Sequence, residues 1–454
     1  MAAMQTVNAA DEYFQGDVDV INAMIDNNNL SAVKNDPENW TFAEWSQNSP
    51  KRIIRIDLRD KGLTGDLEVS DLAGLGYLDV GGLSSMAIVC YPAPSTNLNA
   101  GNTNIISRFL NFLERQLSAI SFLNFQEGQQ TTQDTEQQTT QDAEQQTKTD
   151  SNNPSRYFTS SLTSLNASGC TVLTYLNCNS NKLTDLNVSG CTALTKLYCG
   201  DNELENLNIN DCTELIELHC GDNELVNLNV SGCNELTYLN CQSNQLTNLN
   251  VNGCTALTKL YCGGNQLTNI NVSSCTLLID LYCGSNSLTN LNVNDCTALT
   301  TLYCGGNQLT NLNVLSTALT GMGCDNNQLM SLNVNSYTEL QSLSCSNNLL
   351  TSLDVSNCTK LRTLDCSNNS LMNLNISNCN EIWKLTCSNN QLTSLETLPT
   401  KLQTLDCSNN QLTSLGTLPN SLWNLNCSNN QLTSLGTLSN KLTDLNCENN
   451  PLTG

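Results

Sequence analysis

The cysteines are the residues of this sequence with the greatest potential for chemistry, because a thiolate can attack a substrate, bind a metal or form a disulfide. The chain has 454 residues, and 24 of them are cysteine. Fourteen cysteines follow one another at steps of 21 or 20 residues: Cys178, Cys199, Cys220, Cys241, Cys262, Cys283, Cys304, Cys324, Cys345, Cys366, Cys387, Cys407, Cys427 and Cys447. Such regularity over most of the chain is typical of a stack of repeated coils.

Neither a disulfide nor a zinc site suits these cysteines well. Neighbouring coils would place them ~4.8 Å apart, which keeps the Cβ atoms slightly too distant for a relaxed disulfide. No C-x-x-C pair occurs, as a zinc site would favour. We therefore expect reduced, buried thiols that act as small hydrophobic side chains, with a disulfide ladder as the alternative. We expect no metal and no cofactor.

A second column of cysteines runs through the same coils. It interchanges Cys with other residue types, which favours packing over covalent bonding. Its members are Cys170, Cys191, Cys212, Cys233, Cys254, Cys275 and Cys296, then Thr317 and Tyr337, then Cys358 and Cys379.

No arrangement of residues resembles an active site. The only histidine, His219, directly precedes Cys220, so their side chains leave opposite faces of a strand and cannot form a catalytic pair. Eight carboxylates lie between Asp201 and Glu224, where GDNEL occurs twice. They could hold a hard cation such as calcium, but no full ligand set is evident, and a solvated edge loop is the simpler interpretation. We expect neither an enzyme nor a metal site.

The charge balance argues against several classes of partner. The chain has 42 acidic and 18 basic residues and a net charge of −24, whereas nucleic acids and anionic membranes attract clustered Lys and Arg. No stretch is apolar for long enough to span a bilayer. The first residues, MAAMQTVNAADEYFQG, show no signal peptide. We expect no binding to nucleic acid and no insertion into a membrane.

Each repeat predicts one coil of a solenoid. The unit reads L-x-x-L-x-C-x-x-N-x-L-x-x-L-x-V-x-x-C. Because alternate residues of a strand share a face, Leu176 and Cys178 should point inward, and stacked coils should form a parallel sheet. An asparagine column from Asn181 to Asn450 should bond turn backbone and link each coil to the next. The second half of the unit predicts short strands or extended turns on the convex side.

The run LTYLNCNSNKLTDLNVSGCTA resembles the 21-residue cysteine-ladder repeats of the internalin family of bacterial surface proteins. The resemblance covers residues 162 to 395, and it implies a right-handed, curved leucine-rich-repeat solenoid with its parallel β-sheet on the concave face. Beyond Leu395 the unit shortens to 20 residues and more resembles the repeats of bacterial type III effectors. The resemblance also implies binding of a partner protein and export from a bacterium.

Four segments are expected along the chain. Residues 1–50 contain the amphipathic stretch DVDVINAMIDNN and should form a small helical N-terminal cap. Residues 51–84 hold the first repeats, and residues 162–454 form the main array. Between them, residues 85–161 read as an insertion with one amphipathic helix and a disordered Gln/Thr-rich segment.

Aromatic residues mark the expected binding surface. Outward positions of the strands carry Tyr175, Tyr198, His219, Tyr238, Tyr261, Tyr282 and Tyr303. Rings among varied polar groups are typical of recognition surfaces, although tyrosine also simply suits an exposed strand. Wherever the column of Tyr198 carries Tyr or His, the next outward residue is glycine, as at Gly200 and Gly284, which should leave space for a ligand.

The sequence therefore predicts a non-catalytic scaffold that binds a protein, or a glycan on a protein, through the concave face. The alternative is a structural or self-assembling surface protein that stacks through its solenoid ends, because the sequence finishes at NNPLTG without an evident cap. The expected location is secreted or on the bacterial surface. The alternative location is the cytoplasm or, for an injected effector, a host cell.

Overall fold

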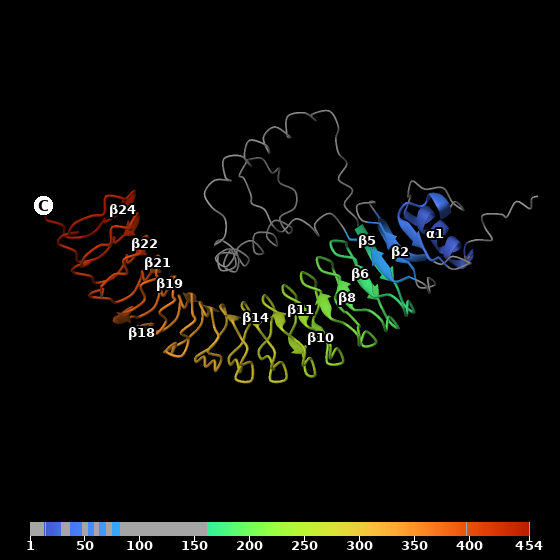
Figure 1. Cartoon of the computed structure of the whole chain (residues 1–454), viewed down its shortest axis with the longest axis horizontal. Helices are drawn as coiled ribbons and strands as arrows, with labels where there is room; N and C mark the ends of the chain where they lie inside the picture. Colours follow the sequence, from blue (N-terminus) through green and yellow to red (C-terminus); the bar gives the residue numbers. More distant parts are fainter. Residues whose placement is uncertain are drawn as a thin grey trace, which may run out of the picture.

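The computed structural model describes residue 13 and residues 15–28, 37–47, 53–58, 63–69, 75–81, 161–395 and 397–453. These residues form a curved solenoid, which appears as an arc in Figure 1. The expected insertion lies outside the described residues except for its last residue, Ser161. Its amphipathic helix and Gln/Thr-rich segment are therefore not described.

A 17-stranded sheet lines the concave face of the arc (Figure 1). Its strands pair in chain order and are all parallel except for β1. They are β1 (Ala43–Trp45), β2 (Ile53–Asp57), β4 (Tyr77–Asp79), β6 (Tyr175–Asn177), β8 (Lys196–Tyr198), β9 (Glu217–His219), β11 (Tyr238–Asn240), β13 (Lys259–Tyr261), β14 (Asp280–Tyr282), β15 (Thr301–Tyr303), β16 (Gly321–Gly323), β17 (Ser342–Ser344), β19 (Thr363–Asp365), β21 (Lys384–Thr386), β22 (Thr404–Asp406), β23 (Asn424–Asn426) and β24 (Asp444–Asn446).

Short strands and extended turns form the convex side, as the second half of the repeat predicts. Strands β3 (Thr64–Glu68), β5 (Ser161–Asn166) and β7 (Asp185–Asn187) make one small sheet, β10 (Asn227–Asn229) and β12 (Asn248–Asn250) a second, and β18 (Ser352–Asp354) and β20 (Asn373–Asn375) a third. The other described coils carry at most single parallel bridges on this side, as between Asn187 and Asn208 and between Asn271 and Asn292.

The first coil is covered by a small helical cap. It contains α1 (Gln15–Asn28) and the short 3-10 helix η2 (Pro37–Asn39). The Asp17 carboxylate of α1 is fully buried and accepts a hydrogen bond of 2.8 Å from the backbone N–H of Ile53 in β2. This contact attaches the helix to the first parallel strand, and α1 buries Ile21 and Met24 in the same core.

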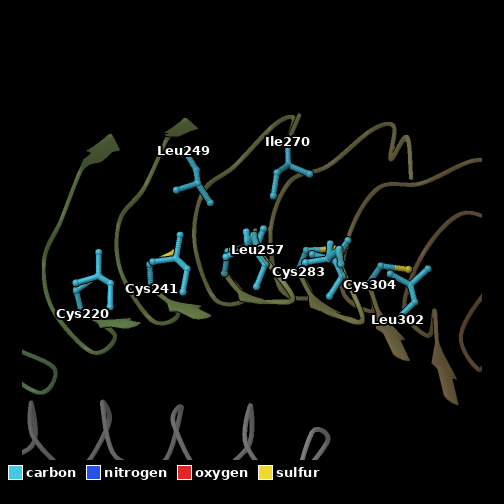
Figure 2. Packing of buried hydrophobic residues seen from close by; sticks show 14 of the residues in the cluster. Cys220, Cys241, Leu249, Leu257, Ile270, Cys283, Leu302 and Cys304 are labelled. Atoms are coloured by element: carbon cyan, nitrogen blue, oxygen red, sulfur yellow. The ribbon is translucent and has the colours of Figure 1, made fainter. Parts of the chain in front are cut away.

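The two sides of each coil meet in a continuous core of leucines and cysteines. Cys220, Cys241, Cys283 and Cys304 enter it from the concave sheet, and Leu249 and Ile270 enter from the convex side (Figure 2). All 23 described cysteines are free, and all but Cys447 are buried. The twenty-fourth, Cys90, lies outside the described residues. The expected row of buried thiols is therefore present.

The asparagine column satisfies the turn backbone as expected. The Nδ2 group of Asn202 donates to the carbonyl oxygens of Cys178 in the preceding coil, Cys199 and Gly200, at 3.0, 3.2 and 3.1 Å. Its Oδ1 atom accepts from the N–H of Leu183 at 3.0 Å. Asn450 at the far end repeats these bonds to its own and the preceding coil. Each amide therefore closes one turn and joins two coils.

Side chains of the second cysteine column donate hydrogen bonds to backbone carbonyl oxygens of the preceding coil. The Cys191 thiol donates to the carbonyl oxygen of Ala167 in the preceding coil at 3.2 Å. Tyr337 is buried at an equivalent position, and its hydroxyl donates to the carbonyl oxygen of Val314 at 3.0 Å. The assignment of Thr317 to this column is wrong, because Thr317 is exposed and the buried Ser316 takes the place. The coil that holds Ser316 is one residue shorter, which shifts the register.

The sheet continues across the segment that is not described. Strand β4 pairs with β6, and β3 pairs with β5, both in parallel. The N–H of Val80 also donates to the carbonyl oxygen of Asn177 at 2.7 Å. Coils on the two sides of residues 82–160 therefore stack as ordinary neighbours. This pairing supports an insertion within one coil, although its limits at 85 and 161 stay a prediction.

Candidate functional site

Eight aromatic rings form one row along the concave sheet between β4 and β15. They are Tyr77, Tyr175, Tyr198, His219, Tyr238, Tyr261, Tyr282 and Tyr303, and we call them the aromatic ladder. The seven residues expected from the sequence all belong to it, and each is half-buried. Tyr77 was missed, although its sequence signal is present: Tyr77 precedes Leu78 as Tyr175 precedes Leu176, at the first position of the strand.

Each ring contacts the ring of the next coil. From Tyr77 to Tyr303, the successive ring centroids lie 4.4, 5.6, 4.6, 4.5, 5.4, 4.7 and 6.2 Å apart. The planes are nearly parallel between Tyr77 and Tyr175, at 3°, and nearly perpendicular between Tyr261 and Tyr282, at 85°. Both arrangements are favourable for aromatic pairs. The rings are therefore held in place before any partner arrives.

Two outward columns of the sequence merge in this row. Tyr175 and Tyr238 stand at the first position of their strands, whereas Tyr198, His219 and Tyr261 stand at the third. Strand register alone pairs Tyr175 with Lys196 rather than with Tyr198. Rings of different columns meet because long side chains reach diagonal neighbours on a sheet, whereas Tyr261, Tyr282 and Tyr303 are direct register partners.

The glycines beside the rings do not leave the open space that we expected. A Cβ atom on Gly284 would lie 2.6 Å from Cε1 of Tyr303 and 2.9 Å from the carbonyl oxygen of Gly305. A Cβ atom on Gly200 would lie 3.2 Å from the carbonyl oxygen of Gly221. These glycines allow neighbouring coils and rings to approach closely, so the space beside them is filled by the next coil.

A charged network crosses the ladder at β8 and β9. Lys196 Nζ lies 2.8 Å from Glu217 Oε1, and the Tyr198 hydroxyl donates a hydrogen bond to Glu217 Oε2. Burial raises the pKa of Tyr198, and the bond to Glu217 adds to the shift. Burial also raises the pKa of Glu217, but the hydrogen bonds from Lys196 and Tyr198 outweigh it and lower the pKa overall. Glu217 is therefore a carboxylate at neutral pH. Farther along, Lys259 pairs with Asp280 at 3.4 Å.

The imidazole of His219 is one of the stacked rings of the ladder, and it lies on the opposite side of the sheet from the buried thiols. Its ring contacts Tyr198 and Tyr238, whereas Cys220 is fully buried in the core. Burial lowers the pKa of His219, and the Glu217 carboxylate opposes only part of that shift. The imidazole is therefore neutral at neutral pH, and it faces the concave side.

The acidic loops between Asp201 and Glu224 carry no metal cluster. Asp201 is exposed and Asp222 is half-buried, as an edge loop requires. Both have a positive φ, of 54° and 55°, which Asp tolerates better than most residues. Burial raises the pKa of Asp222 to about 6, the nearby Asp201 adds to it, and a hydrogen bond with Ser243 opposes it. Within the described residues, no group of three His, Cys, Asp or Glu could hold a metal ion.

No family model matches the chain, and no curated protein matches it. Solved structures do. The functional domain of InlJ from Listeria monocytogenes, which includes a cysteine ladder, is 35% identical with a TM-score of 0.60, over 63% of this chain and 68% of that domain. YopM from Yersinia enterocolitica is 25% identical with a TM-score of 0.50, over 66% of this chain and 74% of YopM.

A leucine-rich-repeat protein of Leptospira interrogans, LIC12759, is 23% identical with a TM-score of 0.52, over 64% of this chain and 85% of that protein, and shares the fold. None of the described helices has the length and apolar character to cross a membrane. The match to InlJ combines 35% identity, coverage of 68% of that domain and the presence of a cysteine ladder in it. The chain therefore belongs to the bacterial leucine-rich-repeat proteins of the cysteine-ladder internalin family.

Proposed function

We propose that the chain is a non-catalytic scaffold that binds a partner protein, or a glycan on a protein, through the aromatic ladder. Its fold is that of a protein-interaction scaffold. The observation that carries the proposal is the ladder itself, in which half-buried rings touch from β4 to β15 on one face. Aromatic side chains dominate the binding energy of many protein interfaces.

The stacked rings would lower the entropic cost of binding. A tyrosine that is already held between two neighbours loses little rotamer freedom when a partner covers it. Lys196, Glu217, Lys259 and Asp280 lie beside the rings and supply polar contacts of both signs. A central aromatic area with charged groups beside it is the usual composition of a protein interface.

Two observations support binding without catalysis. The one histidine stacks in the ladder, and burial raises the pKa of core thiols, to about 12 for Cys199, Cys241 and Cys283, which keeps these three protonated. A protonated thiol is a poor nucleophile. Neither group is placed to activate the other.

We further propose that the chain acts outside the cell that makes it, either secreted or on the bacterial surface. Two related proteins support this proposal. The functional domain of InlJ from Listeria monocytogenes includes a cysteine ladder, and YopM from Yersinia pestis, 26% identical over 65% of this chain, is described as an effector protein.

Affinity capture tests the proposed function. The intact chain and a variant with Tyr198, Tyr261, Tyr282 and Tyr303 changed to Ala would be used as baits for host-cell extracts. A matched control changes four exposed threonines on the opposite side, Thr247, Thr268, Thr289 and Thr310, to Ala. The proposal expects a discrete protein to bind the intact chain and the threonine variant but not the tyrosine variant. Equal capture by all three baits would contradict it.

A further inference from the structure

A second candidate site lies beyond the aromatic ladder, toward the C-terminal part of the arc. A solvent-open cavity of about 410 Å³ is lined by residues that include Arg362, Trp383, Gln403, Glu381 and Lys401. It spans the region of β19, β21 and β22, which are labelled in the orange and red part of Figure 1. The ladder ends at β15, so the two sites do not share a residue.

Three consecutive coils build one wall of this cavity. Arg362, Trp383 and Gln403 each directly precede a strand of the concave sheet. Their backbones continue the sheet ladder: the N–H of Trp383 donates to the carbonyl oxygen of Arg362 at 2.9 Å, and the N–H of Gln403 donates to that of Trp383 at 2.8 Å. The guanidinium, indole and amide groups are therefore carried at regular coil spacing on a rigid edge.

Of the two cationic side chains that line the cavity, only Lys401 has an ion-pair partner among the described residues. Lys401 Nζ donates to both carboxylate oxygens of Glu381, each at 2.7 Å, so this pair neutralises itself. Arg362 is half-buried and makes no ion pair with any described residue. A partly buried guanidinium favours an anion beside it, and its fork of N–H donors matches a carboxylate.

This cationic site stands out in a chain with a net charge of −24. Between residues 161 and 453, half of the basic residues lie between 360 and 401. These are Lys360, Arg362, Lys384 and Lys401, whereas the other four are Lys182, Lys196, Lys259 and Lys441. Lys360 pairs with Glu339. The net negative charge of the chain repels anions, so an anion can bind in this cavity only through favourable contacts with local groups such as Arg362.

The indole of Trp383 adds a second requirement on the ligand. A pyranose ring carries C–H groups on one face, and a flat aromatic surface binds such a face while the hydroxyl groups reach polar neighbours. Gln403 offers both a donor and an acceptor for those hydroxyls. The cavity volume falls in the range of small-molecule sites and exceeds what a simple anion fills.

We propose that this cavity binds a pyranose sugar that carries a carboxylate, with the carboxylate on Arg362 and the ring against Trp383. The ligand would be an acidic sugar residue of a glycan. This inference goes beyond the proposed binding of a partner by the aromatic ladder and does not depend on it, because no residue is common to both sites.

Three small ligands test the chemistry on the intact chain by calorimetry at low ionic strength. Methyl glucuronide carries both the ring and the carboxylate, methyl glucoside lacks the carboxylate, and acetate lacks the ring. We expect methyl glucuronide to bind with a dissociation constant on the order of 1 mM, as an open site allows for a ligand of this size. The other two should bind at least ~10-fold more weakly, since each loses one of the two interactions.

Variants assign the binding to named residues. Arg362→Gln and Trp383→Ala should each weaken methyl glucuronide binding by ~10-fold or more. Trp383→Phe keeps a ring and should stay within ~3-fold of the parent. Trp423→Ala is the matched control, because Trp423 directly precedes β23, occupies the same column and does not line the cavity. It should bind within ~2-fold of the parent.

Several results would overturn the proposal. If acetate bound as tightly as methyl glucuronide, the cavity would be an anion site with no preference for a sugar. If methyl glucoside bound as tightly, the cavity would be a site for neutral sugars. Unchanged glucuronide affinity in both Arg362→Gln and Trp383→Ala would place the ligand elsewhere. Circular dichroism of each variant would confirm that the solenoid is folded, and Trp383→Phe covers the case in which Trp383→Ala fails to fold.

Discussion

The ring of Tyr77 stacks on the ring of Tyr175 at 4.4 Å with an angle of 3°, although the two residues lie on opposite sides of residues 82–160. The aromatic ladder therefore begins before that segment and continues after it. Arg55 lies on the preceding strand, β2, and its guanidinium is 3.5 Å from the centroid of the Tyr77 ring. A cation over an aromatic ring stabilises the position of that ring. The candidate binding surface thus extends farther toward the N-terminal cap than the repeats from Leu162 onward suggest.

The asparagine column should contribute strongly to stability. Asn265 donates to three carbonyl oxygens and accepts from the N–H of Leu246 at 2.9 Å. Asn265→Ala leaves these buried groups without partners, so the free energy of unfolding should fall by about 2–4 kcal/mol. Asn248→Ala, at an exposed position, should change it by less than ~0.5 kcal/mol. Guanidinium unfolding measures both, and equal stability of the two variants would refute the assigned role.

The hydroxyl of Tyr337 should stabilise its coil by donating the hydrogen bond that a thiol donates at the equivalent position of other coils. Tyr337→Phe removes the hydrogen bond to the carbonyl oxygen of Val314 and should lower the free energy of unfolding by ~1–2 kcal/mol. Tyr261→Phe removes a hydroxyl that makes no hydrogen bond with a described residue and should be nearly neutral. A neutral Tyr337→Phe variant in the same unfolding assay would show that this donor is dispensable.

Gly284 should be intolerant of a side chain. Gly284→Ala places a Cβ atom 2.6 Å from Cε1 of Tyr303 and should lower the free energy of unfolding by ~1–3 kcal/mol, because the ring or the coil must move. Gly232→Ala is the control, since nothing lies within 4 Å of its added Cβ. Thermal unfolding compares the two, and equal midpoints would mean that Tyr303 does not occupy the space above Gly284.

The buried thiols should make the fold sensitive to alkaline pH. Burial raises the pKa of Cys199, Cys241 and Cys283 to about 12, whereas an unfolded thiol has a pKa near ~8.5. The folded state therefore holds protons that the unfolded state releases. Their contribution is fully present below pH ~8.5 and is lost as the pH rises toward ~12, by up to ~1.4 kcal/mol per pH unit for each thiol.

Guanidinium unfolding in reducing buffer at pH 7, 9 and 10 checks this expectation. The unfolding midpoint should be lower at pH 10 than at pH 7, and a thiol reagent should label the 22 buried cysteines only after unfolding. A midpoint that is independent of pH, together with rapid labelling of the 22 buried cysteines in the native chain, would show that these thiols are accessible.

The core could be predicted from the sequence because its signal is periodic. Leu176 and Cys178 alternate with outward residues, and Asn181 recurs once per coil, so strand alternation places them without further information. The assignment of Thr317 failed where a coil loses one residue, because a count of residues does not show which neighbour turns inward. The hydrogen bonds show that Ser316 is the residue that turns inward, because its hydroxyl donates to the carbonyl oxygen of Leu299 at 2.7 Å.

The candidate site could be predicted only in part. Seven of the eight ladder residues could be predicted from their outward positions, and Tyr77 was missed. The approach of Tyr175 to Tyr198 depends on side-chain direction, which the sequence pattern does not contain. The same holds for Gly284, whose space is filled from the following coil by Tyr303. The cavity at Trp383 was missed because it needs three consecutive coils and an ion pair between Glu381 and Lys401.

The affinity of the captured partner for single ladder variants tests the central claim most directly. Tyr261 lies in the middle of the aromatic ladder, and Thr268 is an exposed residue of the same coil on the opposite side. Surface plasmon resonance should show that Tyr261→Ala raises the dissociation constant by ~30-fold or more, as loss of a central aromatic anchor does, while Thr268→Ala leaves it within ~2-fold. A partner that tolerates Tyr261→Ala and is lost with Thr268→Ala would contradict binding through the concave face.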